Sequence, residues 1–73
     1  MILNLKEFDE AKKSHQRGDL DKAIILYKRL LEKNNEVSQL HFFLGTALLQ
    51  KKNYEEAYHS LNQAIKLKND VPN

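Results

Sequence analysis

The fold of this chain is decided by two stretches, residues 20–31, which read LDKAIILYKRLL, and residues 54–65, which read YEEAYHSLNQAI. In each stretch the apolar or aromatic residues fall at offsets 0, 3, 4, 7, 10 and 11 from its first position. This spacing follows the turn of an α-helix and not the two-residue period of a strand. We therefore predict two amphipathic helices whose equivalent positions lie 34 residues apart.

A first helical hairpin is predicted from signals at the helix ends. Residues 4–7, NLKE, have the form of a capping box, in which an Asx side chain and a Glu satisfy free backbone N–H groups. The helix that they open is expected to end at Gly18, because glycine favours the left-handed conformation of a helix terminus. Asp19 can then cap the helix over residues 20–31, and Asn34-Asn35 end it.

A second hairpin has the same outline. One helix is expected from about residue 37 to residue 51, and residues 53–56, NYEE, form a second capping-box sequence. The last helix begins there and fades over residues 68–70. Short turns between consecutive helices make them antiparallel neighbours, so we predict an all-α fold of two antiparallel helix–turn–helix hairpins.

Small residues recur at equivalent positions of the two hairpins. Ala11 is matched by Gly45 in the first helices, and Ala23 is matched by Ala57 in the second helices. A small side chain at a helix crossing lets the two axes approach closely while bulky neighbours interlock around it. We expect these four positions to be the places where the paired helices touch.

A helical hairpin repeated every 34 residues resembles the tetratricopeptide repeat (TPR) family. The second copy matches better, because Leu44-Gly45 stands where the family has a Leu-Gly pair and Ala57 is the small residue of the second helix. His41 replaces the family's Trp. The resemblance implies two TPR-like repeats, 4–37 and 38–71, that form one domain and stack as a short α-solenoid of four helices.

Composition excludes several classes of protein. The 73 residues include no cysteine, so neither a disulfide nor a Cys-containing zinc site stabilises the small core. A net charge of +2 is too small to indicate a nucleic acid or a membrane as partner. No apolar run approaches transmembrane length, and residues 1–5 are too short and interrupted for a signal peptide. We expect no nucleic-acid partner, no membrane partner and a cytoplasmic location.

The last helix raises a question about completeness, because each hairpin of a stacked repeat protein is covered by the next one. Three interpretations are open for its outer face. It can be an interface for a homodimer, through residues 54–68, or for a partner helix. The chain can instead be the front of a longer TPR protein, or the apolar side chains can turn inward in a monomer. The expected interface residues are Leu61, Ala64, Ile65 and Leu67.

The resemblance also implies a concave groove, built by the first helix of each hairpin, that accepts a peptide or helix of a protein partner. The expected groove residues are Phe8, Lys12, His15, Gln39, Phe42, Phe43, Thr46, Leu49 and Gln50. Leu5, Asp9 and Gln16 lie on the same faces. Phe43 and Phe8 can equally belong to the core. The Lys and Asn residues of the family's carboxylate clamp are absent, so binding of chaperone tails is not expected.

The sequence offers no constellation for catalysis. His15, His41 and His59 match no metal-ligand spacing, and no glycine-rich phosphate loop is present. Ser14 and His15 are adjacent on a helix and so do not face each other. We expect a non-enzymatic protein-interaction module without cofactor or metal. The alternative is the N-terminal TPR segment of a larger enzyme, such as a glycosyltransferase or a sulfotransferase.

Overall fold

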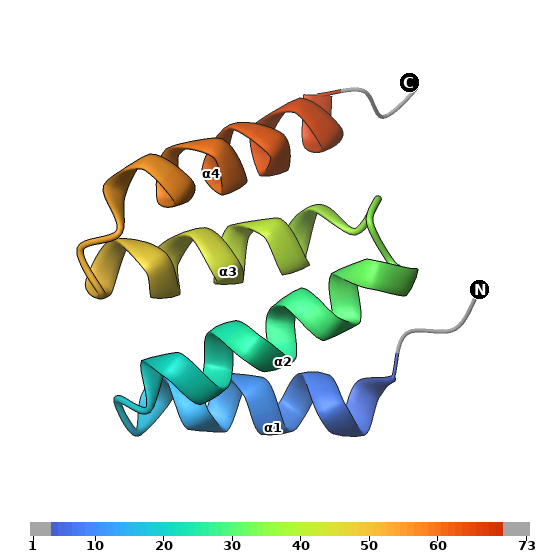
Figure 1. The fold of residues 1–73 in the computed structure, drawn as a ribbon. Coiled ribbons are helices and arrows are strands. Elements are labelled where there is room, and N and C mark those ends of the chain that lie inside the picture. Colours follow the sequence, from blue (N-terminus) through green and yellow to red (C-terminus); the bar gives the residue numbers. More distant parts are fainter. Residues whose placement is uncertain (1–3, 70–73) are drawn as a thin grey trace.

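The computed structural model describes residues 4–69, which form four α-helices: α1 (Leu5–Gln16), α2 (Leu20–Lys33), α3 (Ser38–Gln50) and α4 (Tyr54–Asn69). Consecutive helices are antiparallel and pack in chain order, so that α1 and α4 form the two edges of the stack (Figure 1). The prediction of an all-α fold with two stacked hairpins is confirmed. The end of the second expected repeat, at residue 71, lies outside the described residues.

The predicted caps at Asn4 and Asp19 are present, but neither of the two predicted capping boxes is complete. The Asn4 side chain accepts a hydrogen bond from the Glu7 backbone N–H at 3.1 Å. The Glu7 carboxylate does not return the bond and instead accepts from Arg29 on α2 at 3.2 Å. At the start of α4, the Asn53 amide donates to the Glu56 carboxylate at 2.7 Å. The carboxylates of Glu7 and Glu56 therefore accept hydrogen bonds from side chains and not from the backbone N–H groups at the starts of their helices.

The turns inside the two hairpins have the same geometry. Gly18 and Lys52, 34 residues apart, both have positive φ angles, of 84° and 68°. The N–H of Asp19 donates to the Ser14 carbonyl at 2.9 Å, and the equivalent bond in the second turn has the same length. This six-to-one bond is the mark of a Schellman motif, in which a left-handed residue ends a helix. The predicted role of Gly18 is confirmed.

The link between the hairpins is fixed by a buried asparagine. Asn34 is only 4% exposed, and its side-chain amide donates to the Leu30 carbonyl at 2.9 Å. The Asn34 backbone N–H donates to the same carbonyl at 3.1 Å, so both the backbone and the side chain of this residue bind the C-terminal end of α2. The helix ends at Lys33, so the predicted break at Asn34-Asn35 is confirmed.

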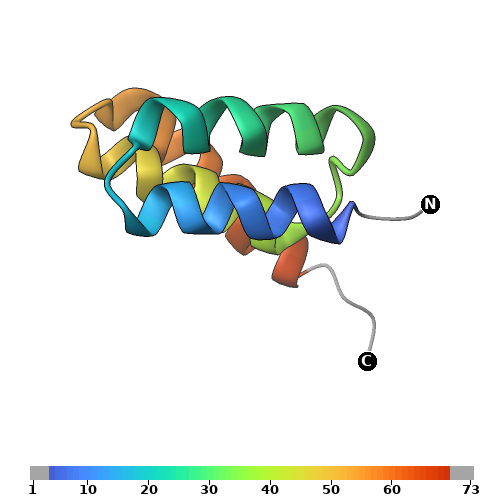
Figure 2. The same cartoon turned by 90° about the horizontal axis from the view of Figure 1, so that it is seen from below.

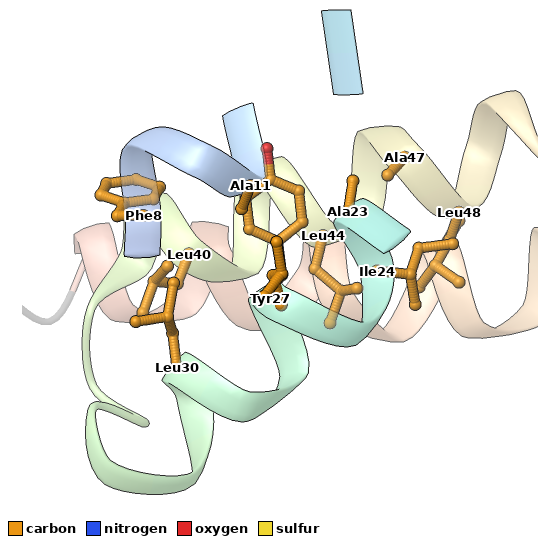
Figure 3. Packing of buried hydrophobic residues seen from close by; sticks show 12 residues of the cluster. Phe8, Ala11, Ala23, Ile24, Tyr27, Leu30, Leu40, Leu44, Ala47 and Leu48 are labelled. Atoms are coloured by element: carbon orange, nitrogen blue, oxygen red, sulfur yellow. The ribbon is translucent and has the colours of Figure 1, made fainter. Parts of the chain in front are cut away.

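The core runs between the helices and is closed at the predicted small positions (Figure 3). Ala11 and Ala23 are completely buried, which confirms the close approach of α1 and α2. In the second hairpin, a Cβ added to Gly45 would lie 2.7 Å from the Cγ and Cδ2 atoms of Leu61. Helices α3 and α4 can therefore pack at this distance only because Gly45 has no side chain.

Candidate functional site

A hollow of about 490 Å³ opens between α1 and α3, with Tyr27 of α2 beneath it. We call it the α1–α3 groove. Its lining residues are Lys12, His15, Gln16, Tyr27, Phe42, Phe43, Thr46 and Gln50. The hollow contains six of the nine groove residues that we predicted from the sequence. The two helices that supply them belong to different hairpins, which pack against each other with α1 and α2 in front of α3 and α4 in Figure 2.

Phe43 is the centre of the aromatic part of the groove. Its ring is stacked on Tyr27, with centroids 6.0 Å apart and an interplanar angle of 14°. The ring of Phe8 contacts the Phe43 ring edge-on, with centroids 5.7 Å apart. The ring of Phe42, the preceding residue on α3, also contacts Phe43 edge-on, at 5.8 Å. Offset and edge-on contacts of this kind stabilise aromatic clusters beyond their buried area. The cluster thus joins α1, α2 and α3 into one rigid apolar surface.

A cation lies beside this aromatic surface. The Lys12 ammonium group is 4.6 Å from the centroid of the Phe8 ring and 6.0 Å from that of Phe43. A cation at this distance over a ring face is attracted by the negative face of the π system. Lys12 therefore brings positive charge to the groove, beside two aromatic rings.

A row of polar groups crosses the other end of the groove. The His15 Nε2 atom lies 2.8 Å from Gln50 Oε1, and its Nδ1 atom lies 3.3 Å from the Tyr27 hydroxyl. Burial raises the pKa of the Tyr27 hydroxyl to about 12, which further favours the protonated form, a hydrogen-bond donor. The hydroxyl can then donate to Nδ1 while Nε2–H donates to the glutamine oxygen. His15 is therefore held by one residue of α2 and one residue of α3.

Three predicted groove residues lie elsewhere. Phe8 is only 6% exposed and belongs to the core, so it supports the groove from beneath instead of lining it. Gln39 lines a different hollow, between α3 and α4. Leu49 is 47% exposed but lines neither hollow.

Tyr27 is the groove residue that sequence reasoning missed. It occupies a core position of the apolar stripe on α2, and its ring is completely buried. Figure 3 shows its hydroxyl at the end of a side chain surrounded by apolar neighbours. The signal was the hydroxyl itself, since a tyrosine on a buried stripe needs a hydrogen-bond partner.

A second hollow, of about 500 Å³, lies between α3 and α4. Three of the four residues predicted for the C-terminal interface line it, namely Leu61, Ala64 and Ile65. Leu67 is half-buried and does not line it. The hollow lies at the edge of the stack that α4 forms, where Figure 1 shows no further helix among the described residues.

Metal sites and membrane-spanning helices are both absent from the described part of the chain, residues 4–69. Over residues 4–69, no group of three or more His, Asp and Glu side chains is placed to hold a metal ion. No helix over the same residues combines the length and the apolarity needed to cross a bilayer.

The fold and the two hollows define a class, the helical-hairpin repeat proteins. A family model described as "Tetratricopeptide repeat" matches residues 14–73 of the chain. The chain belongs to this family, and its predicted resemblance is confirmed. Neither a search of curated proteins nor a search of solved structures gave a significant match.

Proposed function

We propose that the chain is a protein-interaction module whose α1–α3 groove accepts an extended peptide or a helix of a partner protein. The observation that carries the proposal is Phe42, which is 51% exposed beside an open hollow and rests on the rigid ring of Phe43. Exposed aromatic side chains on a rigid support are frequent anchors of protein interfaces. Membership of a repeat family that mediates protein contacts supports the same function.

The lining of the groove indicates the chemistry of the peptide. Lys12 is the only residue in the lining with a permanent charge, and no carboxylate is present there. Gln16 and Gln50 carry amide groups, which can both donate to and accept from a peptide backbone. The best ligand is thus a peptide with an apolar side chain for the aromatic surface and an acidic residue for Lys12.

A displayed library of random peptides would test this function. Peptides selected on the protein should carry an apolar residue next to an acidic one, and Lys12→Glu should weaken their binding by about tenfold. Lys13→Glu is the matched control, because Lys13 is adjacent in sequence, is exposed and pairs with Asp9 at 3.3 Å outside the groove. Equal loss in both variants, or no enrichment of peptides, would count against a groove ligand.

We propose no catalytic role for the module itself, since repeats of this family act through the surfaces that they present. We also propose that it works in the cytoplasm, because a chain without cysteine shows no adaptation to an oxidising compartment.

A homodimer through residues 54–68 is the other use that the sequence suggested for the surface of α4. The internal repeat favours a partner helix over a homodimer on this surface.

A further inference from the structure

The hollow between α3 and α4 is the repeated copy of a surface that is already occupied within the chain. We call it the α3–α4 seat. Its lining residues are Ser38, Gln39, Phe42, Leu61, Ala64, Ile65 and Lys68. Thirty-four residues earlier, the equivalents are Asn4, Leu5, Phe8, Tyr27, Leu30, Leu31 and Asn34. The first hairpin therefore shows what this surface looks like when a helix covers it.

In the first hairpin the covering helix is α3. Phe8 and Tyr27 are 6% and 0% exposed, and the ring of Phe43 from α3 contacts both of them at centroid distances of 5.7 and 6.0 Å. In the second hairpin the equivalent of Phe8 is Phe42, which is 51% exposed. Ile65 on α4 is 59% exposed. The same type of surface is thus buried in one hairpin and open in the other.

We propose that the α3–α4 seat binds an amphipathic helix of another polypeptide that has the apolar pattern of α3. The pattern is given by four residues of α3 at offsets 0, 3, 4 and 7, namely Leu40, Phe43, Leu44 and Ala47. All except the half-buried Phe43 are at most 6% exposed. The partner helix places an aromatic residue between Phe42 and Leu61, as Phe43 lies between Phe8 and Tyr27. Phe42 lines both hollows, but Leu61, Ala64 and Ile65 line the seat alone, so the proposal does not require a ligand in the α1–α3 groove.

Charges near the two ends of α4 set the direction of the partner helix. Lys51, directly after α3, forms an ion pair with Asp21 at the start of α2. The equivalent of Asp21 is Glu55, at the start of α4, while Lys68 lies in the last turn of α4 and lines the seat. A partner helix antiparallel to α4 would therefore carry a basic residue near its C-terminus and an acidic one near its N-terminus. Both charges also suit the macrodipole of the partner helix.

A second copy of the chain does not supply this helix in a head-to-tail stack. The helix equivalent to α3 in the first hairpin is α1. Its residues at the four pattern positions are Lys6, Asp9, Glu10 and Lys13, and all of them are exposed. Placing four charged side chains on the apolar seat would cost their hydration without providing partners. The α1 edge of the stack is a polar cap, so α1 of a second copy does not fit the seat.

The test uses a fluorescein-labelled synthetic helix as probe. It carries Leu, Phe, Leu and Ala at the four pattern positions, Glu in its first turn, Lys in its last turn, and Gln, Glu and Lys at the remaining positions. Binding to the full chain is followed by fluorescence anisotropy. Ile65→Glu should weaken binding by about tenfold or more. The matched control is Ile25→Glu on α2, because Ile25 is 58% exposed and lines neither hollow.

Further variants separate the alternatives. Lys12→Glu, in the groove, should leave binding of this probe unchanged, whatever the fate of the groove peptide. A probe with its terminal charges reversed should bind more weakly, and Glu55→Lys should restore part of the loss. Circular dichroism verifies that each variant folds. Failure of the probe to bind the unaltered chain would overturn the proposal, as would equal losses in Ile65→Glu and Ile25→Glu. A dimer of the unaltered chain that becomes monomeric in Ile65→Glu would show that a second copy covers the seat.

Discussion

Gly18 and Lys52 adopt the same left-handed backbone conformation at equivalent points of the two hairpin turns, with φ angles of 84° and 68°. Glycine reaches this region without steric cost, whereas a lysine Cβ crowds the following carbonyl. Both residues are followed by the same Schellman bond. The second turn therefore keeps the geometry of the first with a less suitable residue.

We predict that Lys52→Gly stabilises the protein by about 0.5–1 kcal/mol, because it removes this crowding. For a chain of this size, the thermal midpoint should rise by roughly 4–8 °C per kcal/mol. Lys51→Gly is the control, because Lys51 has a right-handed helical φ of −80° and gains nothing from glycine. A midpoint that rises equally in both variants would mean that the turn is not under strain at Lys52.

Gly45→Ala tests the close approach of α3 and α4. In an exposed helix this change would stabilise by about 1 kcal/mol. Here the new Cβ would lie 2.7 Å from two Leu61 side-chain atoms and 3.2 Å from its backbone nitrogen. The helices must move apart, and we predict a net destabilisation of about 1–3 kcal/mol in urea unfolding.

A double-mutant cycle identifies the cause of that loss. In a Leu61→Ala background the side-chain clash disappears, so Gly45→Ala should cost much less there than in the unaltered chain. If the two costs simply add, the crowding against Leu61 is not the reason for the glycine.

The adjacent phenylalanines of α3 should behave differently on truncation. Phe43 contacts Phe8, Phe42 and Tyr27, so Phe43→Ala should reduce the free energy of unfolding by about 2–4 kcal/mol. Phe42 is 51% exposed, and Phe42→Ala should cost less than about 1 kcal/mol. Chemical denaturation measures both values. Equal costs would place Phe42 in the core and remove the anchor of the proposed groove.

The ionisation of Tyr27 provides a pH prediction. Burial raises the pKa of its hydroxyl to about 12 in the folded state, whereas a free tyrosine titrates near 10. The folded state therefore disfavours the phenolate. This contribution to stability is complete below about pH 10 and is lost as the pH rises towards about 12.

Ultraviolet titration of the double variant Tyr54→Phe/Tyr58→Phe observes this residue alone, because the chain has three tyrosines. Both replaced tyrosines are exposed, so the fold should tolerate phenylalanine there. The phenolate band should appear near pH 12, or together with loss of helix at lower pH. A band near pH 10 in a protein that remains helical would contradict the burial of the hydroxyl.

Sequence reasoning succeeded where a single local rule decides the structure. The left-handed end at Gly18, the cap at Asn4 and the close packing at Gly45 each follow from one residue type and its position. The 34-residue period then predicts that the second hairpin has the same structure as the first. The all-α fold follows from these local rules and the repeat, without tertiary contacts.

The misplaced residues depend on tertiary contacts that periodicity does not encode. Phe8 faces the groove side of α1, but the ring of Phe43 from α3 covers it. The capping carboxylate of Glu7 has a better partner in Arg29 on the next helix. Lys52 has a positive φ although it is not a glycine, so the residue type gives no signal for the Schellman turn at this position.

The central claim is that this module binds a peptide between α1 and α3. The most direct test is a two-dimensional ¹⁵N–¹H spectrum of the labelled chain, titrated with an apolar–acidic peptide selected from the displayed library. We predict that the amide shifts of Lys12, His15, Thr46 and Gln50 change together and saturate. Shift changes that are confined to α4, or that are spread evenly over the chain, would contradict the claim.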